Sequence, residues 1–417
     1  MHISRLEIRN FRCIEKLNLL FEPGLNVIIG ENNSGKTAVL DALRIALSRG
    51  DERRDIWVSE YDFHVDDDGH LCSPIDIDLV FTDPTELQQA TYIELLAIRD
   101  DGQPELQLHV RFEWDPDKER VKPPSLWGGA NEGQAVPGEV LQLLYHVHLD
   151  ALRDAATYLS PGRRSRVGQL ARKLEPDPDA RENMQADVLA ALQGLDSWTE
   201  LRGKAKSAIN AHLGEVTLDD STLEVDVDFV ESKFRRIAES LRLHLPRRRP
   251  PSDETDASQE PASEMFRIWQ NGLGYNNLIY AAVIFGDLAK TAQVDEAIHL
   301  SLLIEEPEAH LHPQLQRLFF RYLNSIKEIG EGRIQIFVTS HSPTICSQAD
   351  FDRVAALTLI EEVPKSKSFT DLPLGKESKH KLQRFLDVTR SQLFFSKGVI
   401  LVEGISEEQA PGSDLVF

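Results

Sequence analysis

A glycine-rich octet lies between an apolar run and a stretch with helical periodicity. Residues 25–29 are apolar enough for a buried strand, and residues 38–47 have the spacing of a helix. The octet fits G-x-x-x-x-G-K-[ST], in which backbone N–H groups face phosphate oxygens while the lysine and the hydroxyl reach the outer phosphates and Mg²⁺. The pattern therefore predicts a site for ATP and Mg²⁺. The residues assigned to it are Gly30, Glu31, Asn32, Asn33, Ser34, Gly35, Lys36, Thr37 and Ala38.

A pair of acidic residues follows a second apolar run. Residues 300–304 read as a buried strand, and Glu305 and Glu306 come directly after it. A carboxylate at a strand end can hold Mg²⁺, and the next one can orient or deprotonate the attacking water. We therefore assign Glu305 to the metal together with Thr37, and Glu306 to the water. A solvated acidic turn is the alternative interpretation.

A histidine follows a third strand-like run. Residues 335–338 are mainly apolar, and the polar segment after them contains His341. Motifs at successive strand ends meet at one edge of a parallel sheet, so we expect His341 to contact the γ-phosphate. Lys36, Glu306 and His341 are thus the predicted catalytic residues. A purely structural histidine is the alternative.

These segments, together with residues 3–12, resemble the ABC-type ATPases of the RecF, Rad50 and SMC group. Within that group they are most similar to the OLD (overcoming lysogenization defect) family of ATP-dependent nucleases. The resemblance covers residues 1–50 and 265–417 and implies an α/β fold: a P-loop ATPase with a mixed sheet, a helical insert and the start of a Toprim domain. It also implies that ATP lies between two heads of a homodimer or larger homo-oligomer, with Arg12 near the nucleotide.

By the same resemblance, the complete system would cleave DNA in phage defence or DNA processing, and a helicase-like or defence-system protein could act with it. Two other functions remain open. One is a RecF- or SMC-like repair ATPase that clamps DNA without cutting it. The other is a regulatory module that uses ATP only to dimerise.

Two segments match motifs of the family less closely. Residues 270–277, with Gly272 and Gly274, are the candidate signature loop that contacts nucleotide across the dimer. They lack the serine of the Leu-Ser-Gly-Gly-Gln form, and a glycine-containing helix N-terminus is the alternative. Residues 397–407 resemble the first Toprim strand, with Glu403 as a metal ligand and Glu407 as its helper. The expected Asp-x-Asp does not follow, so we expect an incomplete nuclease domain, or only an edge strand of the ATPase at residues 399–402.

Composition limits the possible partners. A chain of 417 residues with 41% apolar side chains has room for two or three domains. No apolar run approaches the ~20 residues of a membrane span, and no signal peptide is visible, so we expect a cytoplasmic protein without membrane contact. The net charge of −22 argues against a general DNA-binding surface. Any DNA contact is expected at local basic patches, residues 163–166 and 247–249.

Breaks in composition divide the chain into five parts. We expect alternating strands at residues 75–81 and 106–112, an exposed loop at 118–137, and one strand at 223–227 within an otherwise helical region. Apolar stripes in that helical region predict self-association. The parts are an N-terminal ATPase lobe (1–159), a helical insert for dimerisation (160–245), a flexible linker (246–263), a C-terminal ATPase lobe (264–390) and a Toprim start (391–417).

Overall fold

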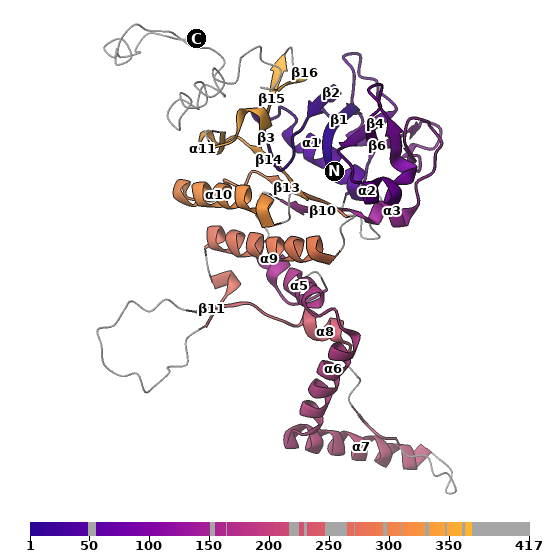
Figure 1. The fold of residues 1–417 in the computed structure, drawn as a ribbon. Helices are drawn as coiled ribbons and strands as arrows, with labels where there is room; N and C mark the ends of the chain where they lie inside the picture. The colour runs from indigo at the N-terminus through magenta and orange to yellow at the C-terminus, as the bar shows by residue number, and fades with distance from the viewer. Residues whose placement is uncertain are drawn as a thin grey trace, which may run out of the picture. The chain divides into compact units, whose positions relative to one another are not determined.

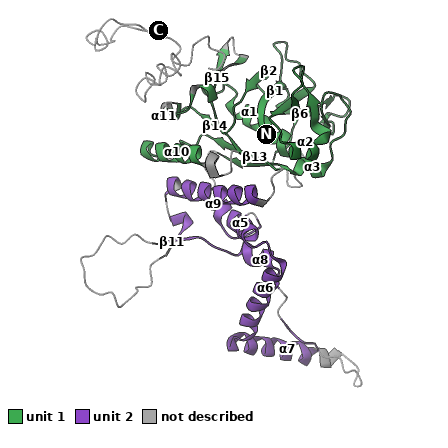
Figure 2. Ribbon diagram, in the orientation of Figure 1, with its two compact units in different colours: residues 1–152, 295–417 green, residues 153–294 purple. Residues whose placement is uncertain are grey.

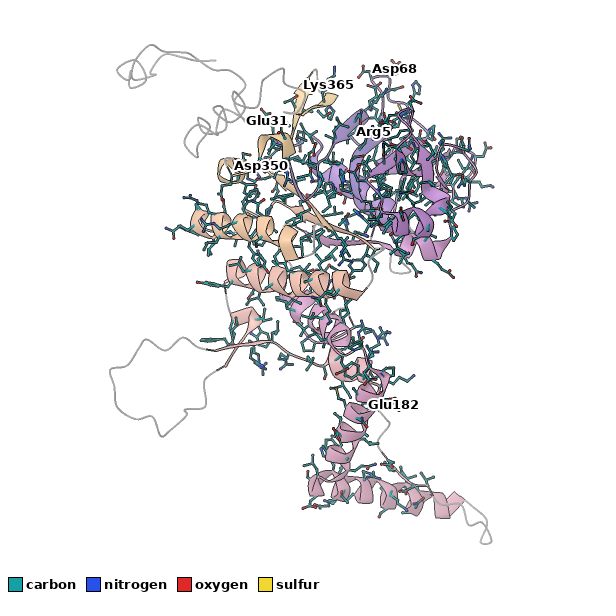
Figure 3. The ribbon with its side chains drawn as sticks, viewed as in Figure 1. Arg5, Glu31, Asp68, Glu182, Asp350 and Lys365 are labelled. Carbon is teal, nitrogen blue, oxygen red and sulfur yellow. The ribbon has the colours of Figure 1, made fainter. Side chains whose placement is uncertain are left out.

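The structure is a computed structural model, and the chain forms two units in it (Figure 2). Unit 1 comprises residues 1–152 and 295–417, and unit 2 comprises residues 153–294. Figure 3 shows the side chains, with Arg5 labelled in unit 1 and Glu182 in unit 2. The described residues are 1–48, 56–150, 155–163, 165–216, 225–228, 232–246, 265–270, 272–294, 298–309, 311–329, 333–346, 348–360 and 363–368.

An antiparallel sheet forms one half of unit 1 (Figure 1). Its strand order is β2-β1-β4-β6-β5, with β9 also paired to β6. Ile77 and Leu79 of β4 face the core, whereas Asp76 and Asp78 alternate with them, which confirms the predicted strand. The strands are β1 (His2–Phe11), β2 (Ile14–Leu20), β4 (Ile75–Thr82), β5 (Leu96–Ile98), β6 (Pro104–Phe112) and β9 (Ser125–Gly128).

A second, largely parallel sheet positions the motifs. Its order is β10-β13-β14-β3-β15-β16, and only the β15–β16 pair is antiparallel within it. The residues of the three central strands are buried along nearly the whole length of each strand, as expected for a sheet that is covered on both faces. The strands are β3 (Leu25–Gly30), β10 (Leu144–Leu149), β13 (His299–Glu305), β14 (Ile334–Ser340), β15 (Val354–Ile360) and β16 (Val363–Ser368).

The helix α1 (Lys36–Leu47) packs between the two sheets (Figure 1). It contacts β1, β4 and β6 of the first sheet and β3, β10, β13 and β14 of the second. Ten of its twelve residues are therefore buried. The helix α10 (Pro313–Ile329) packs on β14 and β3. The fold is thus layered, with the predicted phosphate loop at the start of its central helix.

Unit 2 is mainly helical. Its helices α5 and α4 pack on α9, and α8 packs on α5 and α6. An ion pair of 2.8 Å joins the ammonium of Lys173 on α5 to the buried carboxylate of Asp287 on α9. The elements are α4 (Ala155–Leu159), α5 (Arg166–Leu174), α6 (Pro178–Gln193), α7 (Asp196–Val216), α8 (Phe234–Glu239), β11 (His244–Pro246), β12 (Met265–Arg267), η4 (Ile268–Gln270) and α9 (Leu273–Val294).

Short elements complete unit 1. They connect the strands of the two sheets and contribute no predicted site residue. They are η2 (Glu60–Asp62), α2 (Glu86–Thr91), η3 (Ile93–Leu95), β7 (Trp114–Asp115), β8 (Arg120–Val121), α3 (Gly138–Gln142), α11 (Pro343–Cys346) and η5 (Phe351–Arg353).

Two predicted local structures were wrong. The region 118–137 is not one exposed loop, because β8 and β9 lie in it and Trp127 of β9 stacks on His109 of β6 with 5.1 Å between ring centroids. The described part of the predicted strand 223–227 is not a strand. There the amide and carbonyl groups of Val225 bond to the side chain of Asn210, at 2.8 Å each, instead of to a neighbouring strand.

The unit boundaries differ from the predicted domain boundaries. Unit 2 begins at Arg153 and ends at Val294, so it includes α9 in addition to the predicted insert. The physical reason is that α9 packs on α4 and α5. The assignment of dimerisation to residues 160–245 stays a prediction. Large apolar side chains on α6 and α7 that are exposed, such as Met184, Trp198 and Leu201, are compatible with it.

In the described part of the chain, no helix has the length and apolarity needed to cross a membrane.

A buried histidine on β13 makes the stability of unit 1 depend on pH. His299 is fully buried, its Nε2 lies 2.8 Å from Ser301 Oγ, and its ring packs edge-on against Phe81. Burial penalises the charged imidazolium and lowers the pKa of His299 to about 3. The unfolded chain, with an ordinary pKa near ~6.5, therefore binds a proton at a pH at which the folded chain does not.

The free energy of unfolding should be highest above pH ~6.5 and should fall as the pH drops towards 3. The contribution of His299 is expected to be a loss of ~2 kcal/mol between pH 7 and pH 5. Urea unfolding at both pH values measures it. The variant His299→Gln should lose less stability over this interval, whereas His70→Gln, at an exposed position, should behave as the wild type. Equal pH dependence in all three proteins would contradict the assignment.

Candidate functional site

The phosphate loop joins β3 to α1, as its motif requires. Gly35 adopts a φ of 93°, in the left-handed region that favours glycine. Gly30 is needed for a different reason, because a Cβ there would lie 2.6 Å from the carbonyl oxygen of Leu357 on β15. The two glycines therefore let the loop turn tightly beside a neighbouring strand.

Lys36 is buried and holds the loop together. Its Nζ donates to the carbonyl oxygens of Gly30 and Glu31, at 2.8 Å each. Burial lowers the pKa of the Lys36 ammonium, and the carboxylates of Glu306, Glu308 and Glu305 oppose this. The ammonium is thus the positive charge at the centre of an acidic site.

The two residues assigned to the metal are in direct contact. Thr37 Oγ1 donates to Glu305 Oε1 at 2.5 Å, although the residues lie 268 positions apart. Burial raises the pKa of the Glu305 carboxyl, as do the nearby carboxylates of Asp150 and Asp41, while the Thr37 hydrogen bond opposes the rise. A hydroxyl and a carboxylate are oxygen ligands of the kind that Mg²⁺ prefers.

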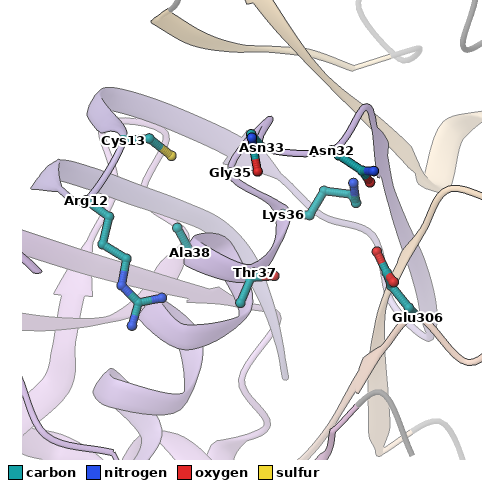
Figure 4. Close-up of a pocket in the computed structure, with 9 residues that line it drawn as sticks. All are labelled: Arg12, Cys13, Asn32, Asn33, Gly35, Lys36, Thr37, Ala38 and Glu306. Carbon is teal, nitrogen blue, oxygen red and sulfur yellow. The ribbon is translucent and has the colours of Figure 1, made fainter.

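The two residues assigned to water and to the γ-phosphate also lie together. His341 Nδ1 is 3.3 Å from Glu306 Oε1. Glu306 has a φ of 43°, which is unfavourable for a side chain with a Cβ and typical of functional sites. Its N–H donates to the carbonyl oxygen of Thr339 at 3.0 Å, so the turn is held by the next strand. Figure 4 shows the Glu306 carboxylate facing the Lys36 ammonium.

Glu308 is a buried residue to which sequence reasoning gave no role. Its Oε1 accepts from Ser340 Oγ at 2.7 Å and from the backbone N–H of His341 at 2.8 Å, and lies 3.5 Å from His341 Nδ1. The carboxylate therefore positions His341. Its place two residues after the acidic pair is a sequence signal that could have identified it.

Residues of the phosphate loop and Glu306 line one pocket (Figure 4). Cys13 also lines it, and no sequence pattern pointed to that residue. Since Glu305 contacts Thr37 and His341 contacts Glu306, all three predicted strand ends meet at this pocket. The lining residues are Arg12, Cys13, Asn32, Asn33, Gly35, Lys36, Thr37, Ala38 and Glu306.

Arg12 lines the pocket, but its guanidinium group is bound by two carboxylates. Its Nη1 donates to Asp41 at 2.6 Å and its Nε to Asp62 at 2.8 Å. In Figure 4 its guanidinium group points away from Lys36. The structure thus places Arg12 near the predicted nucleotide site, with its charge paired to two carboxylates. Neither Asp41 nor Asp62 could be connected to it by sequence spacing.

Other predicted residues are not brought to this pocket by the described structure. Gly272 and Gly274 belong to unit 2, where α9 begins at Leu273, so Gly274 lies in the first turn of a helix. Their signature-loop role stays a prediction. Glu403 and Glu407 lie outside the described residues, as does the whole Toprim segment.

The site fits ATP and Mg²⁺ on its own chemistry. Ser34 Oγ is buried in the loop without a hydrogen-bond partner, which is unusual unless a ligand or water completes it. The α1 N-terminus supplies unpaired N–H groups and a partial positive charge beside it. Lys36 adds a full charge, and the Thr37–Glu305 pair adds the oxygen ligands.

A family model described as "AAA ATPase domain" matches residues 1–122 and 185–346. The chain belongs to this AAA ATPase family. A solved relative of the ATPase is the Smc head domain from Pyrococcus furiosus bound to the C-terminal domain of ScpA, with a TM-score of 0.50 and 15% identity over 92% of this chain and 99% of that one. This likeness supports the predicted ABC, RecF and SMC type of fold.

Two nucleases resemble the ATPase over 98% of its length. The OLD nuclease of Thermus scotoductus (strain ATCC 700910 / SA-01) is 27% identical, and this chain spans 72% of it. Endonuclease GajA of Bacillus cereus (strain VD045) is 24% identical, and this chain spans 66% of it. The predicted OLD-family type of ATPase is thereby confirmed, whereas the Toprim part stays a prediction.

Proposed function

We propose that the ATPase hydrolyses ATP with Mg²⁺ and powers or gates an OLD-type DNA nuclease. The observation that carries this proposal is the contact between Thr37 and Glu305, which joins the phosphate loop to the second motif. The paired Glu306 and His341 complete the set of groups that phosphoryl transfer requires. Family membership supports ATPase activity, and the two similar nucleases support the link to DNA cleavage.

The loop residues would bind and neutralise the triphosphate. Lys36 exchanges its bonds with the carbonyls of Gly30 and Glu31 for bonds to phosphate oxygens. Thr37 and Glu305 would hold Mg²⁺, which supplies charge neutralisation between the phosphates when bound. These hydrogen bonds change when nucleotide binds, so the charged groups would already be in place for the reaction itself.

Glu306 would orient the attacking water and accept its proton. The Glu306 carboxylate faces the Lys36 ammonium in the pocket (Figure 4). A water in line with the outer phosphate would donate to this carboxylate. His341 is held by Glu308 and lies beside Glu306, so it can donate either to that carboxylate or to the γ-phosphate. The released phosphate then carries the oxygen of the water.

The activity of the whole system is part of the proposal. Cleavage of DNA, a role in phage defence, a homodimer and a helicase-like partner are carried over from the family resemblance. The acidic charge of −22 restricts any DNA contact of this chain to local basic patches, such as residues 163–166.

Phosphate release from ATP by the purified chain tests the proposal. Hydrolysis is expected with Mg²⁺ and should stop when EDTA removes the metal. The competing function is a regulatory module that uses ATP only to dimerise. Light scattering with and without ATP measures the molecular mass and so distinguishes this module from an ATP-hydrolysing protein. An increase in mass on ATP binding without any phosphate release would favour that module and contradict hydrolysis.

A further inference from the structure

Three side chains from two neighbouring strands converge beside the proposed Mg²⁺ site. His148 lies near the end of β10, Asp150 follows that strand, and Glu305 is the last residue of β13. The parallel register pairs Leu149 with Ile304, so Asp150 and Glu305 come next in the two strands. Each of the three side chains offers one possible metal-binding atom, a ring nitrogen of His148 or a carboxylate oxygen of Asp150 or Glu305. These three atoms all lie within 4.8 Å of one another.

The donor set is suited to a transition-metal ion. Bonds of ~2.0–2.2 Å to nitrogen and oxygen place two ligands at most ~4.4 Å apart, so the present spacing closes with side-chain shifts of under ~1 Å. Two carboxylates at this distance repel each other unless a cation or proton lies between them. The imidazole distinguishes the group from an acidic cluster that would suit Mg²⁺ or Ca²⁺, because those two ions take oxygen ligands, whereas divalent transition-metal ions also accept imidazole nitrogen.

We propose that His148, Asp150 and Glu305 bind a divalent transition-metal ion, such as Mn²⁺ or Zn²⁺, without any nucleotide. Within the described residues, no second trio of histidine, cysteine or carboxylate donors converges in this way. Glu305 is shared with the proposed Mg²⁺ site through its contact with Thr37. A metal at the trio would therefore fix the Glu305 carboxylate and link the end of β10 to the nucleotide pocket.

This inference shares one residue with the proposed function but does not require hydrolysis. The ion is held by β10 and β13, whereas the phosphates are held by the loop and Lys36. Removing the Lys36 ammonium should therefore leave the metal in place. Metal binding is measured in the absence of ATP. A failure of the metal-site proposal can therefore be told apart from a failure of the proposed ATP hydrolysis.

The test is a titration of the full, nucleotide-free chain with Mn²⁺. Electron paramagnetic resonance measures how much of the ion is free and how much is bound. We expect one Mn²⁺ per chain at this site, with a ¹⁴N coupling from the imidazole. Asp150→Asn, at an exposed position, and His148→Gln should each weaken binding at least ~10-fold, the minimum expected when a direct ligand is lost. His148→Gln should also lose the nitrogen coupling.

Two control variants make the test specific. His109→Gln removes a histidine that is paired with Asp78 on the other sheet, and it should bind Mn²⁺ as the wild type does. Lys36→Ala should also retain the ion. Absence of Mn²⁺ binding without nucleotide, or binding that is the same in wild type, His148→Gln and Asp150→Asn, would overturn the proposal.

Discussion

Replacement of Lys36 by alanine is expected to weaken ATP binding by ~10²-fold or more. The ammonium is buried, and its two present partners are carbonyl oxygens of the same loop. In the nucleotide complex it would instead form charge-assisted hydrogen bonds to phosphate, each contributing ~1.5–3 kcal/mol. The loss of two such bonds costs at least ~3 kcal/mol, which corresponds to a decrease in affinity of ~10²-fold or more.

Calorimetric titration with ATP and Mg²⁺ measures this decrease directly. A suitable control is Lys122→Ala, because Lys122 is exposed and its ammonium forms an ion pair of 2.8 Å with Glu113. That variant should bind ATP as tightly as the wild type. Comparable affinity in Lys36→Ala would mean that the pocket is not a triphosphate site.

Replacement of Glu306 by glutamine should leave ATP binding intact and lower turnover by ~10²-fold or more, the scale expected for the loss of a general base. The amide is nearly isosteric, so it can keep the contact with His341 but cannot accept the proton of water. The strained backbone at Glu306 holds the side chain at the pocket in both proteins. Replacing Glu306 should therefore lower turnover without lowering ATP affinity, whereas replacing Lys36 should lower the affinity itself.

Single-turnover phosphate release together with an ATP titration provides the two readouts. Glu86→Gln on α2, at an exposed position, is the matched control and should leave both unchanged. If turnover in Glu306→Gln equals that of the wild type, another group activates the water. Weaker ATP binding with unchanged turnover would assign Glu306 to nucleotide affinity instead.

The sequence predicted that three motifs meet at one edge of the sheet because each motif is a local signal, whereas the chemical roles of their residues stay predictions. The largely apolar strand that ends at Gly30, the helix that begins at Lys36 and the acidic pair at the end of β13 can each be recognised within one short segment. Their meeting also followed from a general rule, since the ends of parallel strands share one sheet edge. The Thr37–Glu305 contact is the result of that rule in this chain.

The parts that could not be predicted depend on contacts between distant segments. The strand β9 pairs with β6, and its Trp127 stacks on His109 of that strand. The side chain of Asn210 forms hydrogen bonds with the backbone N–H and carbonyl of Val225. These backbone groups therefore bond to a side chain and not to a neighbouring strand. The convergence of Asp150 with Glu305 required the pairing of β10 with β13, which no pattern within either segment reveals.

The burial of α1 between two sheets limits how this helix can vary over evolutionary time. Ten of its twelve residues are buried and Arg44 is half-buried, so nearly every substitution there changes packing, and selection for folding acts on it. Thr37 is the exception, because it is exposed. In a saturation library of the helix, loss of activity at Thr37 therefore reports on chemistry, whereas loss elsewhere in the helix also reports on the abundance of folded protein.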